Sequence, residues 1–406
     1  MNRVTPNKLL RILIVPNHPN AYDQRMVKGL ANGFHVLGHH AHALFAPLAP
    51  IALLRMCENL SIDVVIQVNR TRDPNTPLPS HVRHIAWFQD VFPETLEGFA
   101  EGFEASDILY ALGDAGVLGL HTALPCYVGS LVTGVDQAVI NSRDRPIHSD
   151  QVDFSLCGFI PRPPDTTPQI ARNVAAQRLA GKPIQNLTSL ALRNIIENIY
   201  QNVVEDTYRP LRGELDIHEL TTEMLKSVDL DESSLPHVKA DINYLTREYP
   251  RLLDRVALIT EILQVSKSLE LYGPGWASHP MFQPYAHGMI ETQSGLLDVY
   301  RRSRINLANN THGLGLHSRT FECMAVGGFI FTHASPHDDK PGGMLTAFEP
   351  GIHYGMFTPE NIREEAHRWL KNDKKRIEAG FRAAEVIRER HCWHHRAQQI
   401  INDLGK

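Results

Sequence analysis

Short apolar runs alternate with segments of helical periodicity along the first 140 residues. The segments YDQRMVKGLANGFHVLG and IALLRMCENLSI have the apolar spacing of amphipathic helices. The runs that predict buried strands are RILIVPN, HAHALFA, DVVIQVN, HIAWFQD, SDILYALG and CYVGSL. Strands separated by helices favour a parallel sheet covered on both faces, and such sheets bind ligands beyond the carboxyl ends of their strands. We therefore expect three loops at a cleft, PNHPNAYDQR, NRTRDPN and QDVFPET.

The pattern changes from about residue 153. DFSLCGF predicts one more strand and IPRPPDTTPQ a break, after which residues 168–266 have long amphipathic patterns and few strand signals. A turn or kink is expected near Pro250. Apolar residues are too frequent here for a disordered linker. We interpret the segment as a helical module that either braces its neighbours or forms a wall of a binding site.

Alternation of strands and helices returns in the C-terminal part, with strands predicted at SLELYGPGW, RINLANN, GGFIFTH and IHYGMF. The sequence thus predicts an α/β protein with two doubly wound, Rossmann-like halves and a helical module between them. The expected boundaries are 1–152 for the first half, 153–267 for the module and 268–385 for the second half. A last helix, in 386–406, is expected to pack back on the first half.

Composition excludes several classes of function. The 406 residues are 43% hydrophobic and 21% charged, with a net charge of −5, which is typical of a globular protein and not of a nucleic-acid binder. The run LLRILIV is interrupted by Arg11 and is too short for a signal peptide or a membrane span. Five cysteines without a CxxC pair are typical of reduced thiols. We expect a cytoplasmic protein without a transmembrane segment.

The sequence gives no indication of a metal site. The 22 histidines are scattered and include no HExxH pair. No DxD-type motif follows a predicted strand, and the acids of VDLDESS and HDD are interpreted as solvated or capping residues. We therefore expect no bound metal.

The stretch GLGLHSRTFECMAVGGFIFTH contains the most specific chemical signal. Gly313 and Gly315 provide a flexible loop, and Ser318 is a candidate cap for the helix that follows. Arg319 in the first helical turn opposes the helix dipole, which costs about 0.3–1 kcal/mol unless an anion compensates. A phosphate at this helix N-terminus would do so, and Glu322 one turn later could accept hydrogen bonds from ribose hydroxyls. The alternative is a surface Arg–Glu pair worth about 0.2–0.5 kcal/mol.

A family resemblance accompanies this signal. LELYGPGW, the stretch above and the final FRAAEVIRERHCWHHRAQQII together resemble the bacterial spore-maturation-protein-like branch of the group 1 glycosyltransferases. The resemblance is good over residues 245–400 and looser over 1–160, and 165–240 resembles no family we can name. It implies a GT-B fold, in which two facing Rossmann-like domains bind the acceptor in the N-terminal domain and a nucleotide-sugar donor in the C-terminal one.

The resemblance also implies roles for individual residues. Glu322 matches the ribose-binding glutamate of the family's R-x-F-E helix, and Arg319 matches its basic companion near the diphosphate. Gly273 and Trp276 of YGPGW match a loop near the base or phosphate. Retaining members commonly have a second glutamate eight residues before the ribose-binding one, where this chain has Leu314. The donor sugar and the stereochemical outcome therefore stay open.

Charge stabilisation and proton removal need further residues. In a GT-B enzyme without a metal, cationic side chains and helix N-termini stabilise the leaving diphosphate. Arg319 is the first candidate, followed by His317 and His312. For a catalytic base the cleft loops provide His18 and Asp90. The alternatives are an ordinary loop histidine for His18 and a helix cap or loop hydrogen bond for Asp90.

The sequence thus predicts a metal-independent glycosyltransferase that moves a sugar from a nucleotide-sugar donor to a glycan, protein or small-molecule acceptor. UDP, GDP or TDP would enter as part of the substrate, and no separate cofactor is expected. A GT-B sugar-nucleotide epimerase and a non-catalytic nucleotide- or sugar-binding module are the alternatives. The base, the acceptor and the oligomeric state are left open.

Overall fold

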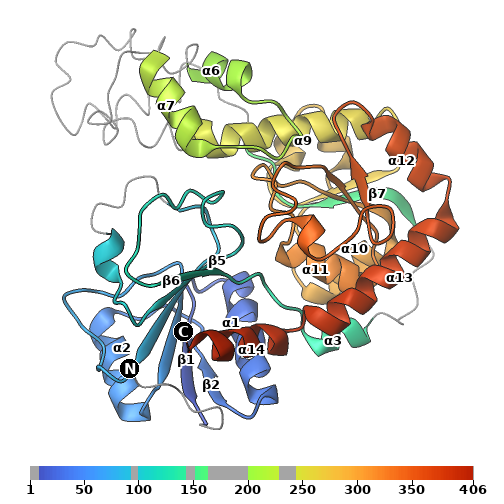
Figure 1. The fold of residues 1–406 in the computed structure, drawn as a ribbon. Helices are drawn as coiled ribbons and strands as arrows, with labels where there is room; N and C mark the ends of the chain where they lie inside the picture. Colours follow the sequence, from blue (N-terminus) through green and yellow to red (C-terminus); the bar gives the residue numbers. More distant parts are fainter. Residues whose placement is uncertain (1–8, 93–98, 143–150, 163–199, 228–243, 406) are drawn as a thin grey trace.

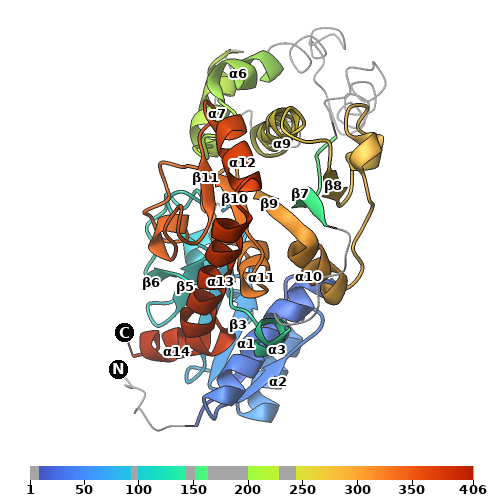
Figure 2. The same ribbon diagram turned by 90° about the vertical axis from the view of Figure 1, so that its right-hand side faces the viewer.

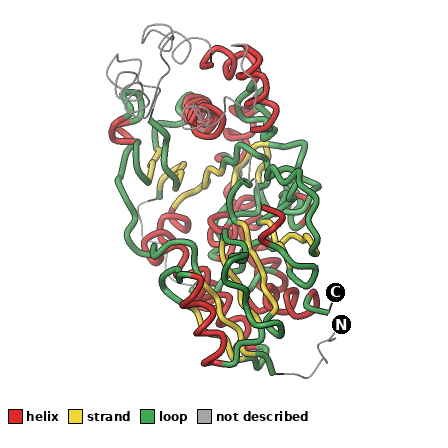
Figure 3. The backbone as a smooth tube through the Cα atoms, turned by 90° about the vertical axis from the view of Figure 1, so that its left-hand side faces the viewer, coloured by secondary structure: helices red, strands yellow, loops and turns green. Residues whose placement is uncertain are grey.

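The computed structural model describes residues 9–92, 99–142, 151–162, 200–227 and 244–405. They form two α/β domains that face each other, with α6 and α7 extending from the C-terminal domain above the N-terminal one (Figure 1). In each domain, strands lie between helices (Figure 3). Two doubly wound domains in this arrangement confirm the predicted fold class.

The N-terminal sheet has six parallel strands in the order β2-β1-β3-β4-β5-β6. Alternate residues of β1 point to opposite faces, so Ile12 and Ile14 pack with α1 (Ala21–Val36), whereas Leu13 and Val15 pack with α2 (Pro50–Leu60). Burial on both faces explains why these strands have nearly continuous apolar runs. The strands are β1 (Arg11–Val15), β2 (His40–Ala43), β3 (Val64–Val68), β4 (Arg83–Phe88), β5 (Ile108–Ala111) and β6 (Tyr127–Ser130).

The C-terminal sheet has five parallel strands in the order β11-β10-β9-β7-β8. They are β7 (Val152–Cys157), β8 (Leu269–Tyr272), β9 (Ser303–Ala308), β10 (Ile330–His333) and β11 (Gly355–Phe357). β7 therefore lies inside the C-terminal sheet, although the sequence pattern places it at the start of the helical module. The strand order reverses between β7 and β9, which is where doubly wound sheets bind ligands.

The helical segment joins this sheet through α9 (Tyr249–Ile262), whose apolar residues share a core with β7, β8 and β9. Near Pro250, where a turn or kink is expected, the helix changes type: a π-helical turn at Tyr244–Glu248 runs directly into α9, and Pro250 is in the first turn of α9. The helices predicted over 168–199 lie outside the described residues. The remaining helices are α3 (Gln137–Asn141), α6 (Tyr200–Thr207), α7 (Ile217–Ser227), α10 (Gln293–Arg302), α11 (Ser318–Ala325), α12 (Ile362–Leu370), α13 (Asp373–Arg390) and α14 (Trp393–Asp403).

None of the helices in the described ranges combines the length and apolar character needed to cross a bilayer.

The chain passes between the domains at two places that lie side by side (Figure 2). Val135 N–H donates to His391 O at 2.9 Å, and Trp393 N–H donates to Val135 O at 3.3 Å. After this point α14 packs on α1 of the N-terminal domain. The Trp393 indole fits because Gly29 lacks a Cβ, which would come within 2.1 Å of Trp393 Nε1, and a Cβ at Gly33 would lie 2.5 Å from the Trp393 carbonyl oxygen. The C-terminal helix thus fastens the two domains together.

Trp393→Ala should reduce the free energy of unfolding by about 3–5 kcal/mol, since it removes a 5%-exposed indole that packs against α1 and edge-on to Trp87. Urea denaturation followed by circular dichroism measures the change. Phe381→Ala, on the exposed face of α13, is the control and should change the value by less than about 0.5 kcal/mol. Equal losses in the two variants would contradict the anchoring role.

Candidate active site

A cavity of about 320 Å³ lies between the two domains. The carboxyl ends of β7 and β9 and the loop between β9 and α11 form its C-terminal wall. The N-terminal wall consists of Gln89, Asp90, Val91, Leu112, Gly113 and Leu118. The cavity is therefore at the reversal of strand order in the C-terminal sheet, where a ligand is expected.

Two arginine side chains meet the backbone turn at the end of β7. Arg319 Nη1 donates to Cys157 O at 2.8 Å, and Arg255 Nη1 donates to Phe159 O. Between them, a Cβ on Gly158 would lie 2.8 Å from a guanidinium nitrogen of each arginine. A larger residue at position 158 would therefore displace the ends of both arginine side chains from this turn, which we call the Gly158 turn (residues 157–159).

In the described part of the chain, no carboxylate pairs with the two arginines at this turn. Among the described residues, neither Arg255 nor Arg319 forms an ion pair, whereas Arg251, also at the cavity, pairs with Glu248 at 3.1 Å. Arg255 is 4% exposed and its Nε atom has no hydrogen-bond partner. Burial and the nearby Arg319 lower the pKa of Arg255 to about 9. Such a cluster is suited to bind an anion with several oxygens.

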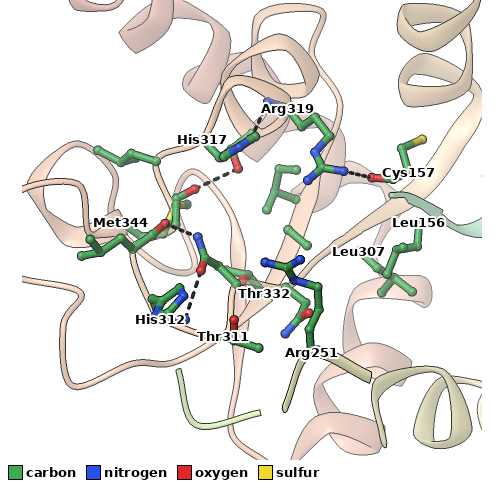
Figure 4. Close-up of a pocket in the computed structure, with 18 of the residues that line it drawn as sticks. Leu156, Cys157, Arg251, Leu307, Thr311, His312, His317, Arg319, Thr332 and Met344 are labelled. Atoms are coloured by element: carbon green, nitrogen blue, oxygen red, sulfur yellow. Dashed lines mark hydrogen bonds between the residues drawn. The ribbon is translucent and has the colours of Figure 1, made fainter. Parts of the chain in front are cut away.

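Figure 4 shows Arg319 and Arg251 pointing into the same space from opposite sides of the cavity. Arg319 comes from α11, and Arg251 comes from α9, one turn before Arg255. Three guanidinium groups from two helices therefore surround the volume next to the Gly158 turn.

His317, and not Ser318, caps α11. Its Nδ1 atom accepts a hydrogen bond from Arg319 N at 3.4 Å, so the cap predicted at Ser318 is wrong. Burial, with Arg319 nearby, lowers the pKa of His317 to about 3, so the ring is neutral at pH 7. Because Nδ1 accepts, the proton of the neutral ring is on Nε2, which can donate a hydrogen bond. His317 thus adds a neutral donor to the cavity that it lines.

His312 and Gly315 also line the cavity. His312 is 8% exposed and its Nδ1 lies 3.3 Å from Leu215 O, while Leu215 N–H donates to Thr311 O at 3.0 Å. Burial lowers the pKa of His312 to about 4. These contacts join the segment before α7 to the loop before α11. The described part of the helical module therefore braces the cavity wall.

Glu322 lies outside the cavity, in a separate small pocket of about 20 Å³ between the domains. Its Oε1 accepts a hydrogen bond from Gln293 Nε2 at 2.9 Å, and Tyr22 and Arg25 of α1 line the same pocket. Burial raises the pKa of Glu322, although Gln293 and Arg25 oppose the shift. Arg319 and Glu322 thus share a helix but open onto different spaces in this conformation.

Gly273 and Trp276 support the Gly158 turn from behind. Trp276 is fully buried and its Nε1 donates to Gly158 O at 2.6 Å. Gly273 has a φ of 122°, and a Cβ there would lie 2.5 Å from Gly158 O. The residues of the YGPGW loop therefore position the turn without lining the cavity.

The two candidate bases are placed differently. Asp90 lines the cavity, is exposed and accepts a hydrogen bond from Asn69 Nδ2 at 2.7 Å. His18 is also exposed, but its ring contacts Asn17 and it is not part of the cavity wall. Leu314 lines the cavity and packs with an apolar cluster of the N-terminal domain. The described cavity wall thus has one carboxylate, that of Asp90.

The sequence analysis does not single out Gly158, Arg251 or Arg255. A signal is present in YPRLLDRVALI, where two arginines four residues apart would share one face of a mostly apolar helix. A glycine directly after the strand DFSLC is a second signal. Neither pattern indicates that the two features meet, because this depends on how α9 packs on β7.

Neither acid of the HDD segment, Asp338 or Asp339, lines the cavity. Asp338 of HDD accepts a hydrogen bond from Ser335 N at 2.8 Å, as expected of a capping residue, and VDLDESS lies outside the described residues. In the described ranges, one group has its donor atoms close enough to hold a metal ion: Cys392, His394 and His395 at the start of α14. This group lies where the chain crosses between the domains and does not line the cavity.

Comparisons with known proteins agree with this architecture. Residues 247–402 match a family model described as glycosyl transferase-like. A glycosyltransferase from Rickettsia africae ESF-5 has a TM-score of 0.51 at 9% identity, with 98% of each chain covered. Sucrose-phosphate synthase from Thermosynechococcus elongatus has a TM-score of 0.48 at 10% identity, covering 97% of each chain. Anabaena Alr3699/HepE in complex with UDP-glucose also has 0.48, at 11% identity, covering 97% of this chain and 99% of that one.

No curated protein matches the sequence. The fold is GT-B, and residues 247–402 match the glycosyl transferase-like family model. The range matched by the family model includes α9 with Arg255 and α11 with Arg319. It does not include the Gly158 turn.

Arg255→Met should raise the melting temperature of the free protein by roughly 2 °C or more while reducing its stabilisation by inorganic pyrophosphate. The pKa of Arg255 is lower in the folded chain than in an unfolded one, so its charge lowers the free energy of unfolding at neutral pH. Thermal denaturation with and without pyrophosphate measures both effects. Arg368→Met, an exposed residue of α12, is the control. A variant that is less stable and responds fully to pyrophosphate would contradict the anion site.

Proposed function

We propose that the chain is a glycosyltransferase that transfers a sugar from a nucleotide-sugar donor, with the donor diphosphate at the Gly158 turn. The observation that carries this proposal is the pair of unpaired guanidinium groups of Arg255 and Arg319 at the strand-order reversal of a GT-B fold. The glycosyl transferase-like match over 247–402 supports the reaction class. We further assign the chain to the spore-maturation-protein-like branch that its C-terminal motifs resemble.

The leaving diphosphate determines what these residues do. When the bond between the anomeric carbon and the diphosphate breaks, negative charge develops on the phosphate oxygens. Already when the donor binds, Arg255 and Arg319 would exchange their backbone carbonyl partners for these oxygens, and His317 would donate from Nε2. A low-dielectric cavity makes each contact stronger than it would be in water. In this proposal the three side chains stabilise the transition state without a metal.

Asp90 is the proposed catalytic base. It is the carboxylate on the described cavity wall, and Asn69 holds it facing the space beside the donor site. An acceptor hydroxyl that transfers its proton to Asp90 becomes the nucleophile. Leu314 occupies the place where retaining relatives have a glutamate, and this agrees with a base-assisted, inverting transfer.

Ribose binding by Glu322 requires the domains to separate. The pocket that contains Glu322 has a volume of about 20 Å³, room for a single water rather than a nucleoside, and α1 closes one side of it through Tyr22 and Arg25. A donor would therefore bind to a more open form, and Tyr22 and Arg25 would approach it on closure. Binding and closure are coupled in this proposal.

A nucleotide screen tests the proposal. UDP, GDP, TDP and CMP are added separately to the full chain, and at least one nucleoside diphosphate should raise the melting temperature. Sugar conjugates of the best nucleotide are then incubated with the protein alone and with candidate acceptors. Slow hydrolysis or transfer supports the proposal, whereas a new sugar nucleotide formed from donor alone would indicate an epimerase. If none of the nucleotides raises the melting temperature, both the glycosyltransferase and the epimerase assignments would be contradicted.

Glu322→Ala should weaken binding of the selected nucleotide by about 1–3 kcal/mol, because hydrogen bonds to the ribose hydroxyls are lost. Titration calorimetry measures the affinity. Pyrophosphate, which lacks the ribose, should bind to Glu322→Ala and to the wild type with the same affinity. Glu291→Ala, an exposed carboxylate just before α10, is the matched control. Equal nucleotide affinity in the wild type and Glu322→Ala would exclude the ribose role.

Activity should survive EDTA, since the proposed diphosphate contacts are all cationic or neutral donors of the protein. Initial rates are measured with and without 5–10 mM EDTA, which is roughly a hundredfold excess over trace metal, and the two rates are compared. Rates within about twofold of each other are expected. Complete loss that Mg²⁺ restores would show that a metal replaces part of the arginine cluster.

A further inference from the structure

We propose that the N-terminal domain binds an acceptor that carries an anionic group next to an apolar ring or chain, and that Arg70 recognises the anion. This inference rests on the proposed glycosyl transfer and specifies the acceptor. It comes from a second cavity, of about 480 Å³, at the carboxyl ends of β3 and β4. This volume is in the range of small-molecule binding sites.

One side of this cavity is apolar. Phe88 at the end of β4 and Phe99 pack edge to face, with ring centroids 5.5 Å apart. Leu48, Leu53 and Leu78 complete the apolar part of the wall. An aromatic ring, an alkyl chain or the apolar face of a sugar would gain free energy by covering this surface.

The two arginines of this cavity differ in how they are paired. Arg72 is buried and forms two hydrogen bonds with Asp107, at 2.6 and 2.8 Å. Arg70 is half-buried, and its contacts are two long hydrogen bonds of 3.4 Å to Asn17. Within the described part of the chain Arg70 forms no ion pair. Its guanidinium group is therefore available to an anion, and a carboxylate or phosphate matches its geometry.

Among the described residues, the acid of the same cavity is not paired with Arg70. Asp73 accepts a hydrogen bond from Asn75 N at 2.8 Å and so belongs to a local turn. The remaining polar groups include the amides of Gln67 and Asn69, and Gln67 already contacts His84 at 3.0 Å. The cavity thus offers one unpaired cation beside an apolar wall.

A hydrogen bond of Asn69 links the second cavity, which we call the acceptor cavity, to the cavity between the domains, which we call the donor cavity. This residue lines the acceptor cavity, and its Nδ2 donates to Asp90 of the donor cavity at 2.7 Å. An acceptor hydroxyl near Asn69 can pass its proton to the Asp90 carboxylate while its oxygen bonds to the anomeric carbon of the donor. The bond from that carbon to the diphosphate breaks, and the diphosphate leaves with the electron pair. The hydrogen bond between Asn69 and Asp90 therefore links the walls of the two cavities beside the proposed base.

A pair of matched glycosides tests the inference. 4-Nitrophenyl β-D-glucuronide and 4-nitrophenyl β-D-glucoside share an aryl group and a sugar ring, and only the first carries a carboxylate. Their dissociation constants for the full chain are measured by calorimetry. The wild type should bind the glucuronide about tenfold more tightly, because the carboxylate gains a charge-assisted contact with Arg70.

Variants then assign this preference to one residue. Arg70→Met should make the two dissociation constants equal within about twofold, and Arg70→Lys should keep part of the preference. Arg55→Met, an exposed arginine of α2 in the same domain, should keep all of it. The melting temperature and the nucleotide response of Arg70→Met, both expected to match the wild type, show that it folds and keeps the donor site.

Equal binding of the two glycosides to the wild type, binding of neither, or an unchanged preference in Arg70→Met would overturn the inference. These outcomes are distinct from failure of the proposed function, in which the wild type would not respond to any nucleoside diphosphate. A wild type that responds to nucleotide but does not discriminate between the glycosides would refute only the anionic acceptor.

Discussion

The contact of two guanidinium groups with the backbone turn at the end of β7 is the feature on which the functional account depends. A buried cation without a carboxylate partner costs free energy, and among the described residues Arg255 contacts the Phe159 carbonyl oxygen and ring but pairs with no carboxylate. The half-buried Arg319 donates to the Cys157 carbonyl oxygen. The surrounding residues preserve this arrangement: Gly158 leaves the space, and Trp276 and Gly273 hold the turn from behind. A structure that maintains such a charge cluster at a ligand-binding edge is prepared for an anion. Pre-organised cations of this kind stabilise a developing negative charge without rearranging during the reaction.

The relation between the domains determines how this site can work. The two crossings of the chain hydrogen-bond to each other, and α14 ties the C-terminal domain to α1. In the observed conformation Leu314 reaches the apolar cluster of the N-terminal domain, and the space at Glu322 is nearly filled. The structure is thus a closed form in which the arginine cluster faces Asp90 across one cavity. Ribose binding by Glu322, as proposed, would require separation of the domains, and the adjacent crossings provide a place for such a motion.

Much of the fold follows from the sequence, because burial on both faces gives each parallel strand an apolar run that a single sequence reveals. Three of the predicted site residues on the α11 loop, His312, Gly315 and His317, do line the cavity together with Arg319 and Asp90. The roles assigned to these residues stay predictions. Arg255 could not be recognised in the sequence, because its position at the site depends on the packing of α9 against β7. Residues 158–248 separate these two elements along the chain. The cap of α11 was misjudged for a local reason: the His317 ring, and not the Ser318 hydroxyl, reaches the first turn.

The central claim is tested most directly by a crystal structure of the protein with the nucleoside diphosphate that stabilises it best. The account predicts electron density for the two phosphates beside the Gly158 turn, with their oxygens within hydrogen-bond distance of the guanidinium groups of Arg255 and Arg319. A nucleotide bound in the N-terminal domain, or arginines that still donate to the Cys157 and Phe159 carbonyl groups while the nucleotide lies elsewhere, would contradict it.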